Sequence, residues 1–302
     1  MAFIVDANLA SQLVTLYAAQ AVDALQPALV MGNLINRAYD NNPGSVGNTV
    51  NVPVPVAPGG FTSANLAEGS TVSFQAPNIS TAQLVVNKHR TAAITIPDMT
   101  QAFTNLDIFG TYIKPLVIQL ASDIEADIFA LYSGLTANTA VGVSATTLTD
   151  AVIDSAETSL FAAYVPPTAE KFLVVSPTAY SGLRQIGSYV NTYQYGPQAE
   201  ALRTGELGSI KGFKVFRSQL VPKPATTTFN IAFAKDAFAM VTRNLGTVPQ
   251  GMGAVSAPIS LGDFGMRLTL SYNPQTVAVQ AVVDCLYGVS VLRNQFGIQV
   301  LS

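Results

Sequence analysis

The chain has 302 residues, of which 11% are charged and 49% hydrophobic, and its formal net charge is −3. An ordinary soluble domain has about 25% charged residues, so we expect much of this surface to be covered by protein or by lipid. The slightly acidic balance argues against a strongly basic nucleic-acid surface. The single cysteine, Cys285, excludes an intramolecular disulfide and a multi-cysteine zinc site.

Of these two explanations for the scarce charge, burial in lipid has less support than burial by protein. A membrane-spanning helix needs about 20 predominantly apolar residues in a row, and the N-terminal stretch is interrupted by Asn8, Gln12 and Thr15. A secretory signal is not expected, because such signals start with positive charge and the first basic residue is Arg37. We therefore expect protein cover and no membrane partner, since interface cores are depleted in charge. A monomer with an unusually uncharged surface stays open as the alternative.

The first predicted element is an amphipathic helix over 7–24. Leu9, Leu13 and Leu16 recur at spacings of three and four, and Asp6 can cap the start. A stretch rich in Asn, Pro and Gly follows and predicts turns up to residue 47.

Residues 48–61, NTVNVPVPVAPGGF, predict a strand with one apolar face. The apolar face consists of Val50, Val52, Val54 and Val56. Pro53 and Pro55 lie between these valines, and because proline cannot donate to a ladder, the strand is expected at a sheet edge. The later stretch TAQLVVNKHRTAAITIPD (81–98) is expected to return beside it and close a long hairpin. A lone hairpin is marginal in water, so its own domain or a neighbouring subunit must support it.

Residues 106–133 predict the clearest helix, because apolar residues form one stripe at helical spacing. The stripe contains Ile113, Leu116, Val117, Leu120, Ile124, Ile128 and Leu131. Pro115 is expected in the first turn, and Asp127, at the edge of the stripe, is expected to be paired or at a boundary.

A second helix is predicted over 149–164, followed by a buried strand at 172–175 and a short helix. The residues after about 205 predict short strands with one further helix, and the chain returns to period-two alternation at Met266, Leu268, Leu270 and Tyr272. The predicted class is α+β.

Catalytic patterns are missing. His89 is the only histidine; it lies between Lys88 and Arg90, and no G-x-S-x-G elbow or phosphate-binding glycine loop accompanies it. Asp123, Glu125 and Asp127 could in principle hold a divalent cation, but a solvated or paired acidic edge is the simpler interpretation. We expect no enzyme activity, no cofactor and no metal.

Several stretches, in their order, resemble the major capsid (coat) proteins of tailed bacteriophages, which have the Hong Kong 97-type fold. These are LVMGNLINRAYDNNPGSVGNTVNVPVPV, NKHRTAAITIPD, the long helix with Asp123 and Asp127, KFLVVSPTAYSGLRQ, TGELGSIKGFKVFRSQLVP and the closing LYGVSVLRNQFGIQVLS.

The resemblance implies five regions. They are an N-terminal arm (1–47), an extended hairpin loop (48–97), a first part of a peripheral domain with a spine helix (98–137), an axial domain (138–262) and return strands of the peripheral domain (263–302). It further implies that the hairpin reaches across a neighbouring subunit, with a hinge at Gly59 and Gly60. The contact residues would be Val50, Val52, Pro53, Val54, Pro55, Val56, Lys88, His89 and Arg90.

The function implied is an icosahedral shell of hexamers and pentamers around a double-stranded DNA genome, bound without sequence specificity. The chain would be found in the virion, as its capsid, after assembly in the host cytoplasm. A separate scaffolding protein and a portal protein are expected partners, and a cement protein is a further one. Two alternatives stay open: the shell of a bacterial nanocompartment with the same fold, and a tail-tube or surface-layer subunit.

Overall fold

The computed structural model describes residues 29–39, 47–54, 63, 65–72, 74–76, 80–99, 112–186, 208–249, 253–261 and 264–302. The chain forms two compact units, each assembled from separated parts of the sequence. Unit 1 contains residues 1–48, 85–130 and 239–289, and unit 2 contains residues 49–84, 131–238 and 290–302. Among the described residues, no helix is both long and apolar enough to cross a bilayer. The helix predicted over 7–24 lies outside the described residues.

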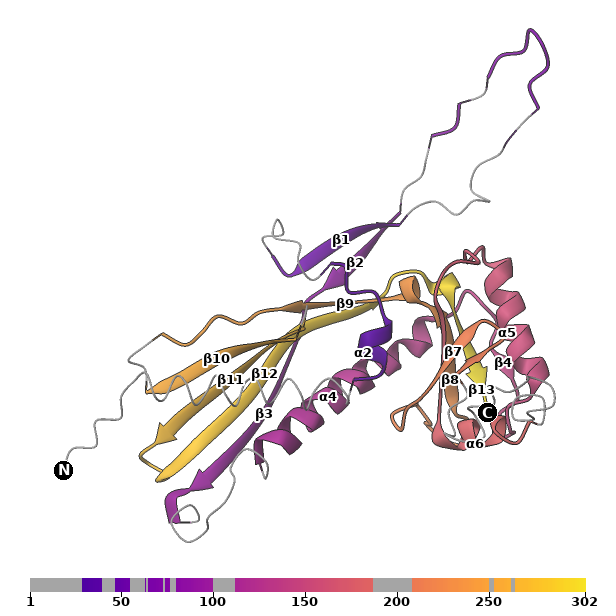
Figure 1. Ribbon diagram of the computed structural model, residues 1–302. Coiled ribbons are helices and arrows are strands. Elements are labelled where there is room, and N and C mark those ends of the chain that lie inside the picture. Colours follow the sequence, from indigo (N-terminus) through magenta and orange to yellow (C-terminus); the bar gives the residue numbers. More distant parts are fainter. Residues whose placement is uncertain are drawn as a thin grey trace. The chain divides into compact units, whose positions relative to one another are not determined.

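A five-stranded sheet forms the body of unit 1 (Figure 1). Its strands are β3 (Lys88–Pro97), β9 (Phe238–Arg243), β10 (Ala254–Leu261), β11 (Phe264–Asn273) and β12 (Ala278–Val291). The order β10-β11-β12-β3 is antiparallel throughout, and β9 pairs with β12 off this path. In β12, buried Ala281 and Val283 alternate with half-buried Gln280 and Val282. The sheet therefore has one well-buried face and one more open face.

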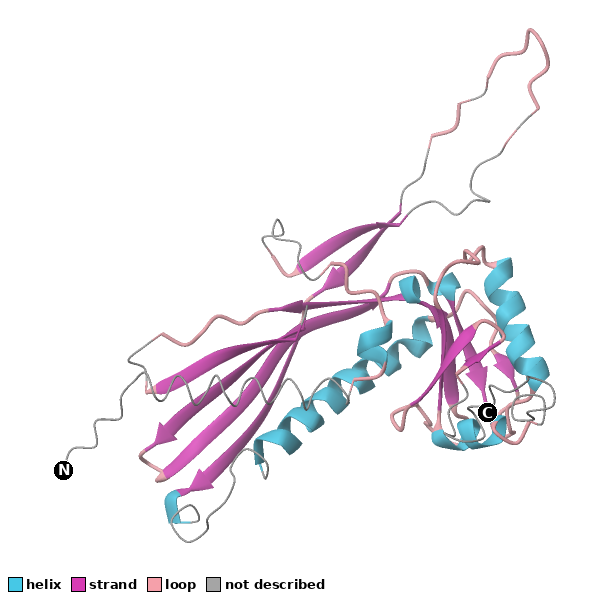
Figure 2. Cartoon of the chain, in the orientation of Figure 1, coloured by secondary structure: helices cyan, strands magenta, loops and turns pink. Residues whose placement is uncertain are grey.

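Helix α4 (Lys114–Phe129) runs beside β3 in unit 1 (Figure 2). Its buried side chains recur at helical spacing and include Val117, Leu120, Ile124 and Ile128. The predicted apolar stripe is thereby confirmed, and Pro115 lies in the first turn as expected. The helix gives way to the 3-10 turn η4 (Ala130–Gly134), and the short helix α2 (Met31–Leu34) packs against α4.

A six-stranded mixed sheet, ordered β4-β13-β8-β5-β7-β6, forms the core of unit 2. Its strands are β4 (Val141–Gly142), β5 (Lys171–Val175), β6 (Ser209–Ile210), β7 (Phe213–Arg217), β8 (Phe229–Ala234) and β13 (Gly297–Leu301). The helices of this unit are α5 (Asp150–Ala162), α6 (Pro177–Leu183) and the 3-10 turns η5 (Lys235–Ala237) and η6 (Asn294–Phe296). Every residue of β5 is buried, and the apolar run from Phe172 to Val175 is typical of such a central strand.

The hairpin β6–β7 turns through two residues, Lys211 and Gly212. Both have positive φ, 47° and 79°, which is the backbone of a type I′ turn and explains the glycine. The Lys211 ammonium lies 2.8 Å from Asp150 and 2.5 Å from Asp154, one turn apart on α5. The stretch GSIKGFKVF thus forms a tight hairpin that is tied to the start of α5.

The predicted long hairpin divides into two strands with different partners. Strand β2 (Ser80–Val85) pairs with β1 (Thr49–Val54), whereas β3 pairs with β12. Only Val86 and Asn87 separate β2 from β3. Gly288 of β12 lies against this joint, since a Cβ there would be 2.2 Å from the Val85 carbonyl oxygen. The expectation that 81–98 returns as one hairpin strand is therefore wrong, because its second half completes the sheet of unit 1.

The two units cut across the regions expected from the sequence. Strand β10 and most of β9, within the region 138–262, belong to unit 1. Strand β13, within the region 263–302, lies between β4 and β8 in unit 2. The partner of a strand is chosen by long-range pairing that a period-two pattern does not report.

Candidate functional site

The start of β3 carries the three basic residues that the sequence analysis proposed as contacts. Because side chains alternate along a strand, Lys88 and Arg90 point to the face that α4 covers, while His89 points to the opposite face. Each face holds one acidic partner from the same chain, Asp127 for the first pair and Asp284 for His89.

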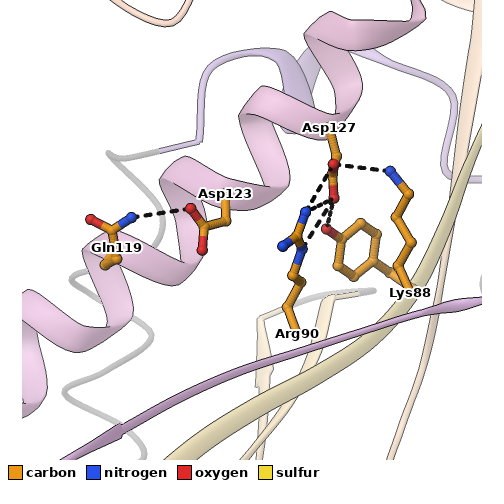
Figure 3. Close-up of polar contacts among 6 residues, drawn as sticks. Lys88, Arg90, Gln119, Asp123 and Asp127 are labelled. Atoms are coloured by element: carbon orange, nitrogen blue, oxygen red, sulfur yellow. Dashed lines mark hydrogen bonds and ion pairs between the residues drawn. The ribbon is translucent and has the colours of Figure 1, made fainter.

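Asp127 of α4 accepts from three donors, as Figure 3 shows. The Lys88 ammonium lies 3.0 Å from Oδ1, and Arg90 Nη2 donates to both carboxylate oxygens at 3.1 Å. The buried Tyr287 hydroxyl donates to Oδ2 at 2.5 Å. The expectation that Asp127 is paired is thus confirmed, and the cluster ties α4 to β3 and β12.

The electrostatics of this cluster favour the ionised carboxylate. Burial raises the pKa of Asp127, but the hydrogen bonds from its three donors outweigh burial and hold the pKa below its usual value. Burial, together with the hydrogen bond to Asp127, raises the pKa of the Tyr287 hydroxyl. Tyr287 therefore stays protonated and acts as a donor.

Asp284 forms the second cluster, on the other face of the sheet. Its side chain is 4% exposed and receives a two-pronged contact from Arg267, with Nε to Oδ1 at 3.1 Å and Nη2 to Oδ2 at 2.6 Å. His89 Nε2 lies 3.1 Å from Oδ2. Arg267 also donates to the Gly246 carbonyl at 2.8 Å. This bidentate geometry is the strong form of a carboxylate–guanidinium pair.

Sequence reasoning missed Arg267, Asp284 and Tyr287. The signal was present for Asp284, since it stands in the apolar run AVVDCLYG, and a carboxylate buried in such a strand requires a cationic partner. The identity of that partner depends on the pairing of β11 with β12, which places Arg267 opposite Asp284.

The three carboxylates of α4 do not form a metal site. Glu125 is buried and accepts from the Gly32 amide at 2.9 Å, Asp123 accepts from Gln119 at 3.0 Å, and Asp127 is occupied as described. Burial raises the pKa of Glu125 against the lowering effect of the amides at the start of α2. Within the described ranges, no three metal-ligating side chains come together.

The proposed hairpin contacts divide by burial. Val50 and Val52 are 2% and 1% exposed within the single chain, so the expectation that a neighbour buries these two side chains is wrong. Pro53 is exposed and Val54 is half-buried. The remaining members, Pro55, Val56 and the hinge glycines Gly59 and Gly60, lie outside the described residues.

Pro53 removes one donor from the outer edge of β1. The Val86 amide donates to the Asn48 carbonyl at 2.7 Å, and this pair fixes the alternation along β1. It directs the even-numbered amides toward β2 and the odd-numbered positions outward. Pro53 therefore stands at an outward position, where its missing N–H removes a donor from the free edge and none from the ladder.

In chemical terms, both clusters are ion-pair clamps within one chain. Each carboxylate is neutralised by basic side chains from neighbouring strands, and both clusters hold elements of unit 1 together. His89 is oriented by Asp284, and this carboxylate is also engaged by Arg267. The arrangement supports a structural role for these residues.

The comparisons with known proteins point the same way. No family model and no curated protein sequence matches the chain. Among solved structures, a chain from Mycobacterium phage Che8 has a TM-score of 0.66 at 20% identity, with 90% of each chain covered. A chain from the capsid of Ralstonia phage GP4 has a TM-score of 0.60 at 13% identity, covering 89% of this chain and 87% of that chain.

A third structure extends the likeness beyond bacteriophages. A virus-like particle from Pyrococcus furiosus matches with a TM-score of 0.55 at 10% identity, covering 95% of this chain and 98% of that chain. At these identities the likeness lies in the fold rather than in the sequence. The chain therefore has the α+β fold of phage capsid subunits, as the sequence resemblance predicted.

Proposed function

We propose that this chain is the major capsid protein of a tailed bacteriophage and self-assembles into an icosahedral shell around double-stranded DNA. The observation that carries the proposal is the likeness to phage capsid subunits over nearly the whole chain, 89% in the GP4 capsid. The scarcity of charge supports it, because a subunit with 11% charged residues has much surface suited to burial in a symmetric assembly.

The two units fit the roles of the two domains of such a subunit. We assign unit 2, with its compact six-stranded sheet, to the axial domain around which hexamers and pentamers form. Unit 1, with its long sheet and α4, is assigned to the peripheral domain. The loop between β1 and β2 would be the extended arm, and its side chains at Leu66, Val72 and Phe74 are 55%, 58% and 92% exposed. Such apolar exposure is suited to contact with a neighbouring subunit.

The partners follow from this role. A scaffolding protein, a portal protein and a cement protein would contact the shell, and the DNA inside would be held without sequence specificity. The shell itself would be located in the virion after assembly in the host cytoplasm. We propose no catalytic activity for the chain.

A second function shares the same fold: the shell of a bacterial nanocompartment. The observation in its favour is the match to the Pyrococcus furiosus virus-like particle, which covers a larger share of both chains than the phage matches do. The contents of the particle separate the two functions, since a phage shell encloses DNA and a nanocompartment encloses protein.

The test is negative-stain electron microscopy of the purified protein beside size-exclusion chromatography. Closed particles of uniform diameter are expected, either from the protein alone or after co-expression with the scaffolding protein of the same genome. Nuclease-protected DNA within particles purified from infected cells would support the phage function. Protein cargo without DNA would favour the nanocompartment, and tubes or flat sheets would contradict both.

A further inference from the structure

Most sheet edges in the described part of the chain are poorly suited to receive another strand. Edge strands β4 and β6 of unit 2 have two residues each. Strand β1 carries Pro53 at its outward position, and β10 carries Pro258, which has no N–H to donate. These are established ways of preventing edge-to-edge pairing. Strand β2 leaves a free edge of six residues.

Strand β3 presents the longest of the unprotected edges in the described part of the chain. It is ten residues long and, among the described residues, pairs only with β12. Its single proline, Pro97, is its last residue, so nine residues of backbone form an edge without a proline. A long edge of this kind is a template for the addition of a further strand.

The register identifies which backbone groups face outward. The Asp98 amide donates to the Val277 carbonyl at 3.2 Å, in line with the β3–β12 register in which Pro97 lies opposite Ala278. In an antiparallel ladder this pattern alternates, so the even-numbered residues of β3 bond to β12. The outward N–H and C=O groups are those of His89, Thr91, Ala93 and Thr95. Pro97 falls at the next outward position and interrupts no bond to β12.

The side chains along this edge do not oppose a second strand. Residues 91–96 are Thr, Ala, Ala, Ile, Thr and Ile, which are uncharged and, apart from the alanines, favour strands. Protective edges in other proteins carry lysine or inward-pointing charge. The charges that precede this stretch, Lys88 and Arg90, share the carboxylate of Asp127 on the face that α4 covers.

We propose that the free edge of β3 is an assembly site that receives a strand from a second copy of this chain, an inference that rests on the proposed shell function. The second copy is the partner that a homopolymeric shell supplies at every position. The prolines in β1 and β10 protect those edges from random pairing, and the nine-residue stretch of β3 without proline is the longest edge left for strand addition. The bonds would form through the backbone, with the four outward residues exchanging N–H and C=O contacts with the neighbour.

The first experiment uses two adjacent alanines as a matched pair. Ala93→Pro removes an outward N–H and leaves the bonds to β12 intact, whereas Ala92→Pro removes an N–H that bonds to β12 opposite Val283. We expect Ala93→Pro to keep the melting temperature of the unassembled subunit near that of the wild type. The subunit concentration at half-assembly should rise by on the order of tenfold, as the loss of one well-formed hydrogen bond per contact predicts. Ala92→Pro should lower the melting temperature of the subunit itself.

The second experiment measures residue-resolved amide hydrogen exchange of the wild type, in dilute unassembled subunits and in particles. Protection of the outward amides of Thr91, Ala93 and Thr95 in particles alone supports the proposal. Particles that form while these amides exchange as fast as in the subunit overturn it and leave the shell function standing. Protection already present in the subunit also overturns it, because the chain then covers its own edge. If no particles form under any assembly condition, the shell function fails first.

Discussion

The carboxylate of Asp127 offers the sharpest test of how unit 1 is held together. Asp127→Asn removes the charge that Lys88 and Arg90 neutralise, and it weakens the acceptor of the Tyr287 hydroxyl. The lysine and arginine side chains are 34% and 45% exposed, so solvent screening reduces each ion pair to about 0.5 kcal/mol. The hydrogen bond from buried Tyr287 to a charged acceptor adds about 1.5 kcal/mol. We therefore expect a loss of about 2.5 kcal/mol in the free energy of unfolding.

The assay is thermal or urea unfolding of the unassembled subunit. A loss of about 2.5 kcal/mol corresponds to a fall in melting temperature of about 4 °C for a chain of this length, because the unfolding entropy is about 2.1 cal/mol/K per residue. The matched control is Asp123→Asn, one turn earlier on the same helix (Figure 3), where the carboxylate accepts a hydrogen bond from Gln119 on the same helix. This control should change stability by less than about 0.5 kcal/mol.

The pH dependence gives the result that would refute the reasoning. The pKa of Asp127 is lowered by folding, so its stabilising contribution is present above the unfolded pKa, about 3.9, and is lost as the pH falls through the folded pKa. The difference between wild type and Asp127→Asn should therefore be constant from about pH 7 to about pH 5 and shrink below about pH 4. A difference that stays equally large down to about pH 3, or that Asp123→Asn reproduces, would contradict the clamp.

Three further outcomes are expected. Val52→Asp should unfold or strongly destabilise the subunit, because it places a charge at a side chain that is 1% exposed. Val54→Asp, at a half-buried position, should leave a folded subunit that assembles poorly. Circular dichroism measures the folding of each variant, and particle yield measures its assembly. Folding raises the pKa of Glu125 through burial. The stability of the wild type relative to Glu125→Gln should therefore fall as the pH rises from about 4.3 through the folded pKa. If urea unfolding gives a stability difference between the two proteins that does not change with pH, Glu125 does not titrate in this way. Asp284→Asn should lower the free energy of unfolding by about 3 kcal/mol, because it leaves Arg267 without its bidentate partner. Thermal unfolding of Asp284→Asn and of the double variant with Arg267→Met tests this cause. The double variant should recover part of the lost stability.

Local patterns predicted the elements whose structure depends on nearby residues. Helix α4 was found from one apolar stripe and from a proline at its first turn. Strand β5 was found from an uninterrupted apolar run, which matches its complete burial. The pairing of Asp127 was expected because a carboxylate within an apolar helical face needs a partner. In each case the deciding information lies within about 20 residues of sequence.

The errors concern choices between distant partners. The stretch from residue 81 to residue 98 reads as one strand, yet it changes partner at Val86 and Asn87 because β12 supplies a longer ladder for its second half. The apolar face of β1 predicts burial by a neighbour, whereas Val50 and Val52 are buried within the chain itself. A period of two reports that a face is covered, and it does not report which surface covers it.

The partner of β3 also determines when its edge comes into existence. Strands β3 and β12 meet across long sequence separations, 195 residues for the contact of His89 with Asp284, and contacts of such separation form late and slowly. Until β12 arrives, residues 88–97 have no ladder, and therefore no ordered row of outward N–H and C=O groups. A nascent or partly folded chain would thus lack the surface on which we propose that a second copy docks. The order of folding would thus delay docking between subunits until unit 1 is complete.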